Sequence, residues 1–146
     1  IHFVDNRAGW VVGQEGTILA TTDAGRTWTL QDPGVADAQS APKLERIPRN
    51  GGVDMIDAGD RTPGLTFGSI RLSTHSRGWI VGRFANHGRS VILTTDNGGA
   101  TWIEDARIDG EDLLVLATSG AAVWTVGEHV GEGAQAIYRR QVAGSN

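Results

Sequence analysis

Short apolar runs separated by turn residues dominate the chain. Runs such as residues 10–13, 17–22, 79–81 and 91–95 are rich in the β-branched and aromatic side chains that are typical of strands. Clusters of Gly, Asn and Asp bound these runs, and none of the runs is long enough to predict a helix. The pattern therefore predicts an all-β fold.

The runs recur as an internal repeat. The sequence GWVVG at residues 9–13 returns as GWIVG at 78–82 and, more weakly, as VWTVG at 123–127. The second interval is about 45 residues, which is the length of a propeller blade, and the first is longer by an insertion of roughly 25–30 residues. Four short strands at this spacing predict the blades of a β-propeller.

We expect about three four-stranded antiparallel blades, the last incomplete. The first is predicted to have strands at 3–5, 10–13, 17–22 and 27–31, and the second at 68–73, 79–83, 90–95 and 101–104. The third is predicted to have strands at 113–118, 123–127 and 135–140, with its fourth missing or degenerate in 141–146. The single domain 1–146 thus divides into blade 1 (about 1–31), an inserted loop (about 32–66), blade 2 (about 67–105) and blade 3 (about 112–146).

Three blades do not close a ring, since propellers use about four to eight. We therefore expect either that the chain is part of a longer propeller or that copies assemble, in which case two chains supply six blades. An open stack would leave strand edges and apolar faces exposed, which favours pairing.

Residues 21–28 match the pattern S/T-x-D-x-G-x-T-W. An Asp in such a turn accepts hydrogen bonds from nearby backbone N–H groups, Gly supplies a position with positive φ, and Trp supplies a large apolar anchor. The residues expected in these structural roles are Thr21, Asp23, Gly25, Thr27 and Trp28.

A second copy of the turn lies at residues 94–102 and is one residue longer. Counted back from Thr101 and Trp102, Asn97 takes the Asp position and Gly99 the Gly position. Counted forward from Thr95, Asp96 takes the Asp position instead. Asn makes the same kind of cap, so we expect the turn to form in either case.

These motifs resemble those of the Asp-box (BNR-repeat) β-propellers. The chain is most similar to the photosystem II assembly factor family, Ycf48/Hcf136-like, which has bacterial relatives outside photosynthesis, and the resemblance covers about residues 1–31 and 68–140. Asp-boxes also occur in sialidases, sortilin-type receptors and secreted glycoside hydrolases, always as a structural hairpin away from the active face. The resemblance thus implies a propeller and a structural role for Asp23 and Asp96.

Composition narrows the function further. The chain has 13 basic and 17 acidic residues and a net charge of −4, which argues against nucleic-acid binding. The absence of Cys excludes disulfides, a thiolate nucleophile and zinc–thiolate sites. No apolar run is long enough to predict a membrane span. Because the chain opens on IHFV without Met, we expect a mature, trimmed or partial product. The expected location is extracytoplasmic: periplasmic, cell-surface or secreted.

Candidate chemistry is sparse. Histidines 2, 75, 87 and 129 show no ligand spacing, and the acidic clusters 54/57/60 and 105/109/111/112 are expected to be solvated loops rather than cation sites. An R-I-P sequence at 46–48 matches a sialidase motif, but it follows the first Asp-box rather than preceding it, and the only tyrosine, Tyr138, lies in a predicted strand. We therefore expect no metal, no cofactor, no catalytic residue and no enzyme activity.

Two loops are candidates for binding, since loops on a rigid scaffold usually carry it. One is the segment 34–63, a binding loop or a tether, and the other is 83–89. The candidate binding residues are Arg46, Arg49, Arg83, Phe84, His87 and Arg89. The predicted function is a non-catalytic bacterial propeller module that binds a protein partner or scaffolds an assembly. The alternatives are a fragment of a secreted sialidase or glycoside hydrolase, and a self-assembling structural or surface component.

Overall fold

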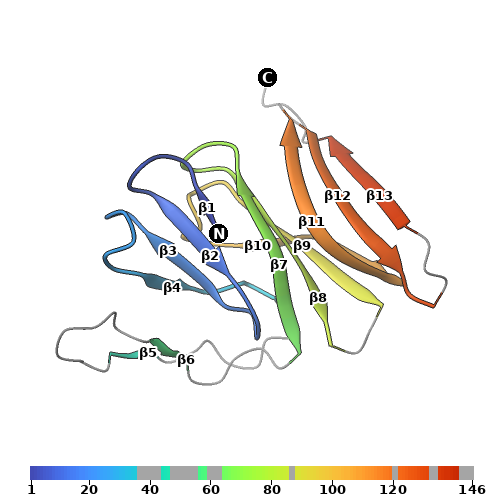
Figure 1. Ribbon diagram of the computed structural model, residues 1–146, viewed down its shortest axis with the longest axis horizontal. Coiled ribbons are helices and arrows are strands. Elements are labelled where there is room, and N and C mark those ends of the chain that lie inside the picture. Colours follow the sequence, from blue (N-terminus) through green and yellow to red (C-terminus); the bar gives the residue numbers. More distant parts are fainter. Residues whose placement is uncertain are drawn as a thin grey trace.

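The computed structural model confirms the all-β prediction (Figure 1). It describes residues 1–35, 44–46, 56–58, 64–85, 88–119, 122–131 and 135–141. Within these ranges no helix is long and apolar enough to cross a bilayer. All pairings between strands are antiparallel, and every sheet runs in the order of the sequence, as expected of blades built from successive hairpins.

Three sheets stand in a row from blue to red in Figure 1. The first consists of β1 (His2–Phe3), β2 (Gly9–Val12), β3 (Ile18–Thr21) and β4 (Thr29–Gln31). The second consists of β7 (Leu65–Leu72), β8 (Gly78–Phe84), β9 (Arg89–Thr95) and β10 (Ile103–Asp109). The third consists of β11 (Glu111–Ser119), β12 (Ala122–His129) and β13 (Gln135–Gln141).

Some strand bounds differ from the predicted ones. A further pair, β5 (Leu44–Arg46) with β6 (Ile56–Ala58), forms within the segment expected to be a loop. β7 begins at Leu65, before the predicted start at residue 68. Its Thr66 forms an isolated antiparallel bridge with Gln14, which follows β2 of the first sheet. β10 continues to Asp109 because that residue still pairs with Arg89. The acidic segment that was expected to be a solvated loop is therefore mostly strand.

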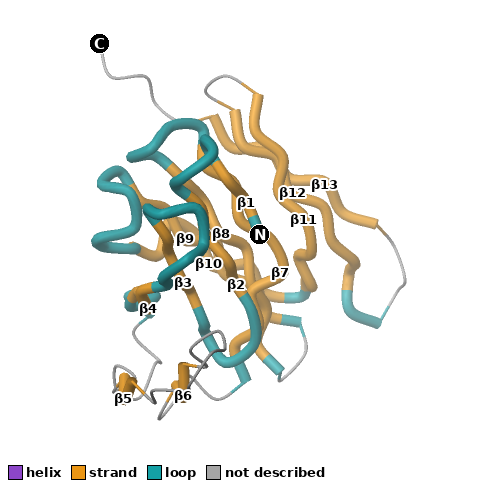
Figure 2. Tube along the Cα trace, turned by 60° about the vertical axis from the view of Figure 1, so that its left-hand side comes forward, coloured by secondary structure: helices purple, strands orange, loops and turns teal. Residues whose placement is uncertain are grey.

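The three sheets stack face to face (Figure 2). They bury two apolar cores between them. The core between the first and second sheets contains Trp10, Ile18, Ile80, Leu93 and Trp102, among others. The core between the second and third contains Trp79, Val81, Ile92, Leu113 and Leu116, among others. β8 contributes to both cores, which explains its nearly continuous burial.

Hairpin turns gather at two opposite ends of the sheets. We call one of them the turn end; there, the β3–β4 and β9–β10 turns carry the two motifs 21–28 and 95–102. We call the opposite end the loop end. At the loop end, the β8–β9, β10–β11 and β12–β13 turns lie next to one another, and β7 begins there with Gly64 bonded to Ala85. The two candidate binding arginines of the β8–β9 hairpin, Arg83 and Arg89, lie at the loop end, away from both motifs.

Candidate functional site

Backbone hydrogen bonds join three turns of the loop end into one strip. We call residues 83–85, 88–89, 109–112 and 128–131 the loop-end strip. The N–H of Gly110 donates to the carbonyl of Gly88, and the N–H of Val130 donates to the carbonyl of Gly110 at 2.9 Å. Gly88 also donates its N–H to Asp112 Oδ1 at 3.4 Å. The strip is thus held as one surface across the second and third sheets.

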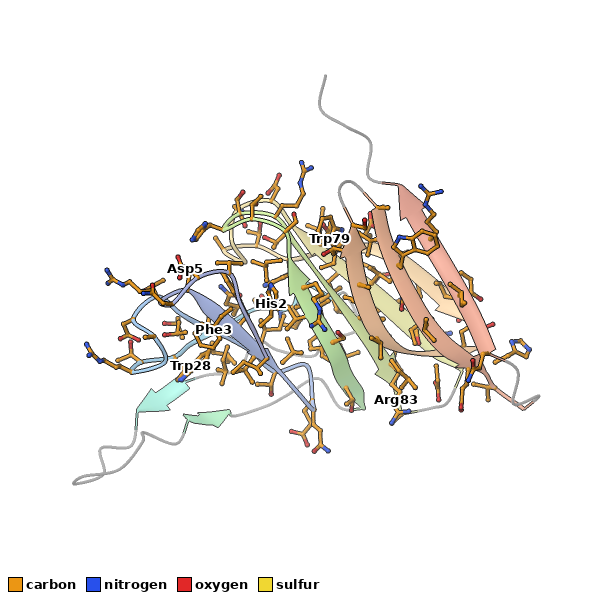
Figure 3. All side chains as sticks on the ribbon, turned by 45° about the horizontal axis from the view of Figure 1, so that its top comes forward. His2, Phe3, Asp5, Trp28, Trp79 and Arg83 are labelled. Atoms are coloured by element: carbon orange, nitrogen blue, oxygen red, sulfur yellow. The ribbon has the colours of Figure 1, made fainter. Side chains whose placement is uncertain are left out.

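Arg83 and Arg89 are the two cations of the strip, and each is paired with an aspartate. Arg83 Nη1 lies 3.7 Å from Asp112 Oδ2, and Arg89 Nε donates to Asp109 Oδ1 at 3.0 Å. About half of each arginine side chain is exposed, 48% and 51%. Because a guanidinium has five N–H donors, each arginine keeps donors for a further acceptor. Figure 3 shows Arg83 at this end.

Glu111 and Ser90 organise the base of the strip. The buried Ser90 hydroxyl donates to the Glu111 carbonyl at 2.7 Å and accepts from the Leu113 N–H at 2.9 Å. Glu111 Oε1 lies 2.9 Å from His129 Nδ1. The acidic cluster predicted from the sequence is therefore built into sheet contacts. Among the residues that the structure describes, no group of three His, Asp or Glu side chains could hold a metal ion.

Phe84 has a different environment from the arginines that flank it. Its half-buried ring packs against the first core, and the Arg107 guanidinium lies 5.4 Å from the ring centroid. Arg107 is held in turn by Glu104, to which its Nη2 donates at 2.6 Å. Phe84 therefore serves as packing for the second sheet more than as a surface anchor.

Three of the candidate binding side chains lie outside the described residues. Arg46 belongs to β5, but its side chain, together with Arg49 and His87, lies outside the described residues. The same holds for the side chains of the acidic cluster 54/57/60 and for most of the R-I-P sequence.

The first turn motif is closed by hydrogen bonds to Asp23. Asp23 Oδ1 accepts from the Thr27 N–H and from Thr21 Oγ1, both at 2.8 Å, and Oδ2 accepts from Thr27 Oγ1 at 2.6 Å. These bonds, led by the one from the Thr27 hydroxyl, lower the pKa of Asp23 from 3.8 to about 2. Gly25 has a φ of +83°, as the motif predicts. Because all these contacts lie within the turn, Asp23 stabilises the turn itself.

The second turn settles which residue takes the Asp position. Asn97 Oδ1 accepts from the Thr101 N–H at 3.0 Å and from Thr95 Oγ1 at 2.9 Å, and Asn97 Nδ2 donates to Thr101 Oγ1 at 2.8 Å. Asn97 thus makes the same contacts as Asp23, except that Asn97 donates to the Thr101 hydroxyl, whereas Asp23 accepts from the Thr27 hydroxyl. The turn therefore runs from Thr95 to Trp102 and has the same length as the first, which corrects the prediction of an extra residue. Asp96 lies outside the cap and is exposed.

The two motif tryptophans differ in burial. Trp102 is 3% exposed in the first core, and its Nε1 donates to Gln31 Oε1 at 3.0 Å. Trp28 is only half-buried and contacts the Phe3 ring edge-on, at 6.3 Å between centroids (Figure 3). The anchor role expected of Trp28 is thus fulfilled by Trp102, because only Trp102 has a neighbouring sheet on its side.

Two features of the site were not predicted. Asp5 of the β1–β2 turn accepts from His75 Nε2 of the β7–β8 turn at 2.7 Å, which joins two sheets at the turn end. A cavity of about 200 Å³ lies between the second and third sheets; its lining residues are Trp79, Ile92, Asp105, Ala106, Ile108, Val123, Thr125, Tyr138 and Arg139. Burial and the nearby Glu111 raise the pKa of Tyr138. Neither feature has a local sequence signal, since each joins segments far apart in the chain.

No protein-family model and no curated protein sequence matches the chain. Eight chains of solved structures match its fold. One of them, YCF48 bound to D1 peptide, aligns with 99% of this chain at a TM-score of 0.58 and 24% identity. This chain spans 37% of the length of that one. The likeness confirms the predicted propeller fold.

Proposed function

We propose that this chain is a non-catalytic module of an Asp-box, Ycf48-like propeller that binds a protein partner and scaffolds the assembly of a larger complex. The observation that carries the proposal is the loop-end strip, in which hydrogen bonds between turns hold Arg83 and Arg89 half-exposed on one surface. YCF48, which has a similar fold, is bound to D1 peptide in its own structure.

A protein segment fits the chemistry of this strip. A surface whose described turn residues are already hydrogen-bonded to one another loses little conformational freedom on binding. The arginines offer N–H donors to the carbonyl and carboxylate groups of an incoming chain, and Arg is enriched at protein interfaces. The exposed Asp109 and Glu128 offer acceptors beside them. The strip therefore suits an extended segment that carries both donors and acceptors.

The environments of the three histidines within the described residues, and of Tyr138, support a non-catalytic role. His2, His75 and His129 contact, respectively, the Leu72 carbonyl, Asp5 and Glu111. The raised pKa of Tyr138 disfavours the phenolate that a tyrosine nucleophile requires. As part of the same proposal, the protein works outside the cytoplasm of a bacterium, which fractionation of the source cells tests.

Fluorescence anisotropy with a labelled D1 peptide tests the proposal. We expect saturable binding that weakens at least about tenfold in the double variant Arg83→Ala/Arg89→Ala, since each arginine provides a charge-assisted contact. Arg26→Ala is the matched control, because Arg26 is an exposed arginine of the turn end. Absence of binding, or equal loss in the control, would contradict a D1-binding role of the strip. Hydrolysis of an aryl-sialoside that is lost in Arg46→Ala would support the glycoside-acting alternative instead.

A further inference from the structure

The second turn contains an Asn–Gly pair where the first turn has Asp and Ala. Asn97 and Gly98 take the places of Asp23 and Ala24. Asparagine is a thermolabile residue, and an asparagine followed by glycine is especially prone to deamidation, because glycine has no side chain to shield its backbone nitrogen. The second turn thus carries a reactive pair inside its structural cap.

Deamidation exchanges the side-chain nitrogen of the asparagine for an oxygen. The backbone nitrogen of Gly98 loses its proton and forms a bond to Cγ of Asn97, and the side-chain nitrogen leaves as ammonia. Water from the solvent then opens the cyclic succinimide. Opening at Cγ gives aspartate with the original backbone, whereas opening at the backbone carbonyl gives isoaspartate, in which the main chain runs through the former side chain. Water is consumed and ammonia released in equal amounts, and no atom changes its oxidation state.

The fold leaves this pair open to water but holds its reacting atoms apart. Asn97 is exposed. The N–H of Gly98 donates to the Ser76 carbonyl at 2.8 Å, so the nitrogen is directed toward the β7–β8 turn and keeps its proton. The carboxamide of Asn97 is fixed in the cap by its bonds to Thr95 and Thr101. Attack on Cγ therefore requires local opening of the turn.

The first turn has the same backbone bond without the reactive pair. The N–H of Ala24 donates to the carbonyl of Arg7, in the β1–β2 turn, at 2.9 Å. In both sheets, then, the residue that follows the capping side chain is tied to the preceding hairpin turn. Only in the second sheet does this bond also hold the nitrogen that would attack an asparagine.

We propose that Asn97 is a deamidation site that stays closed while Gly98 is bonded to Ser76 and that reacts when the β7–β8 and β9–β10 turns separate. The aspartate product fits the cap, because Asp23 accepts from both the N–H and the hydroxyl of Thr27 in the equivalent place. The isoaspartate product does not fit, since it adds a carbon to the main chain ahead of Gly98. The site lies at the turn end and does not depend on the binding role of the loop-end strip.

Peptide mapping by mass spectrometry tests the site, after incubation of the native and the urea-unfolded protein in the same mildly alkaline buffer. The tryptic peptide 90–107 contains Asn97 as its only Asn and has no Gln, so its mass gain is assigned without ambiguity. We expect deamidation of Asn97 to be at least about tenfold slower in the native protein, because several hydrogen bonds must break first. Equal rates in the two samples would overturn the proposal.

A second Asn–Gly pair in the same chain provides the internal reference. Asn50 and Gly51 lie in the tryptic peptide 50–61, which has no other Asn and no Gln. In urea the two pairs should react at similar rates, because the local sequence alone then governs the reaction. A far slower reaction of Asn97 in urea would show that the sequence, and not the fold, limits it, and would also overturn the proposal.

A variant of the β7–β8 turn tests the gate itself. The hydroxyl of Thr74 accepts from the N–H groups of Ser76, at 3.3 Å, and Arg77, at 2.9 Å. Thr74→Ala should therefore loosen the Ser76 carbonyl and speed deamidation of the native protein at least about threefold, as expected for the loss of such bonds. Thr22→Ala, which removes an exposed threonine of the first motif, is the matched control and should leave the rate unchanged.

Circular dichroism shows whether each variant keeps its sheets. A folded Thr74→Ala variant that deamidates at the parent rate would contradict the gate, and if that variant does not fold, the comparison of native and unfolded parent protein still decides. Asn97→Asp tests the fit of the aspartate product: it should be about as resistant to urea as the parent near neutral pH, and a clear loss of stability would show that the product does not fit the cap.

Discussion

His75 of the second sheet donates a hydrogen bond to Asp5 of the first, with 2.7 Å between Nε2 and Oδ2. Asp5 Oδ1 also accepts from the N–H groups of Ala8 and Arg7, and these contacts, led by the one from Ala8, lower the pKa of Asp5 to about 2. The β1–β2 and β7–β8 turns are thus tied together at the turn end.

Replacement of His75 by Ala should raise the pKa of Asp5, because one donor to the ionised carboxylate is lost. The pKa should stay below 3.8, since the bonds from Ala8 and Arg7 remain. An NMR titration of the Asp5 side-chain carboxyl group measures both values. An identical pKa in the variant would mean that the two turns do not meet in solution.

Acid should weaken the first turn and spare the second. The pKa of Asp23 in the folded protein, about 2, lies below its ordinary value of 3.8, so its contribution to stability is present above pH 4 and is lost as the pH falls through about 2. Asp23→Asn should therefore lose less unfolding free energy between pH 5 and pH 2 than the parent, since the side chain no longer titrates. The second turn shows that Asn closes the same cap.

Urea unfolding at the two pH values, with the same buffers for parent and variant, measures this difference. Other carboxylates contribute equally to both proteins and cancel. Equal losses in parent and variant would refute the role of Asp23 as an ionised cap.

Trp102→Ala should cost about 3–5 kcal/mol, as expected for removal of a buried aromatic ring. Trp28→Ala should cost less, about 1–2 kcal/mol, because the half-buried ring removes less area from water. Urea unfolding of each variant beside the parent protein measures both losses. A loss for Trp28→Ala as large as that for Trp102→Ala would mean that the Trp28 ring is buried in solution.

Gly98→Ala should destabilise the second turn by about 1–2 kcal/mol, the usual cost of a left-handed conformation for a residue with a Cβ. Gly98 has a φ of +71°, and a Cβ there would lie 2.9 Å from the His75 carbonyl oxygen. Its counterpart in the first turn is Ala24, which already has a φ of +63°. Ala24→Gly should accordingly be neutral or stabilising by up to about 1 kcal/mol. Thermal unfolding of both variants measures the contrast. Stabilisation by Gly98→Ala, or a clear loss of stability in Ala24→Gly, would mean that this turn position does not favour glycine.

Local sequence predicted most of the strands and both turns because their signals are local. Alternating apolar positions predict a strand wherever one face is buried, and the Thr21, Asp23 and Thr27 pattern encodes a cap whose contacts lie within four residues. Even so, the sequence alone left Asp96 and Asn97 as alternatives for the second cap. Only the pairing of β9 with β10, which places Thr95 and Thr101 on either side of Asn97, decides between them.

Burial and charge pairing required the tertiary structure. Trp28 and Trp102 occupy the same motif position, as do Trp79 and Trp124 in their repeats. Trp102 and Trp79 are buried, whereas Trp28 is only half-buried and Trp124 is 38% exposed. The difference depends on whether a neighbouring sheet lies on that side, which no local pattern encodes. Likewise, Arg83 and Arg89 were predicted from their residue types, but their aspartate partners lie more than a strand away along the chain. By itself the sequence determined the repeat, its strands and its turns, because these depend on neighbours along the chain; the packing of sheet on sheet decided which faces are covered, because it depends on neighbours in space.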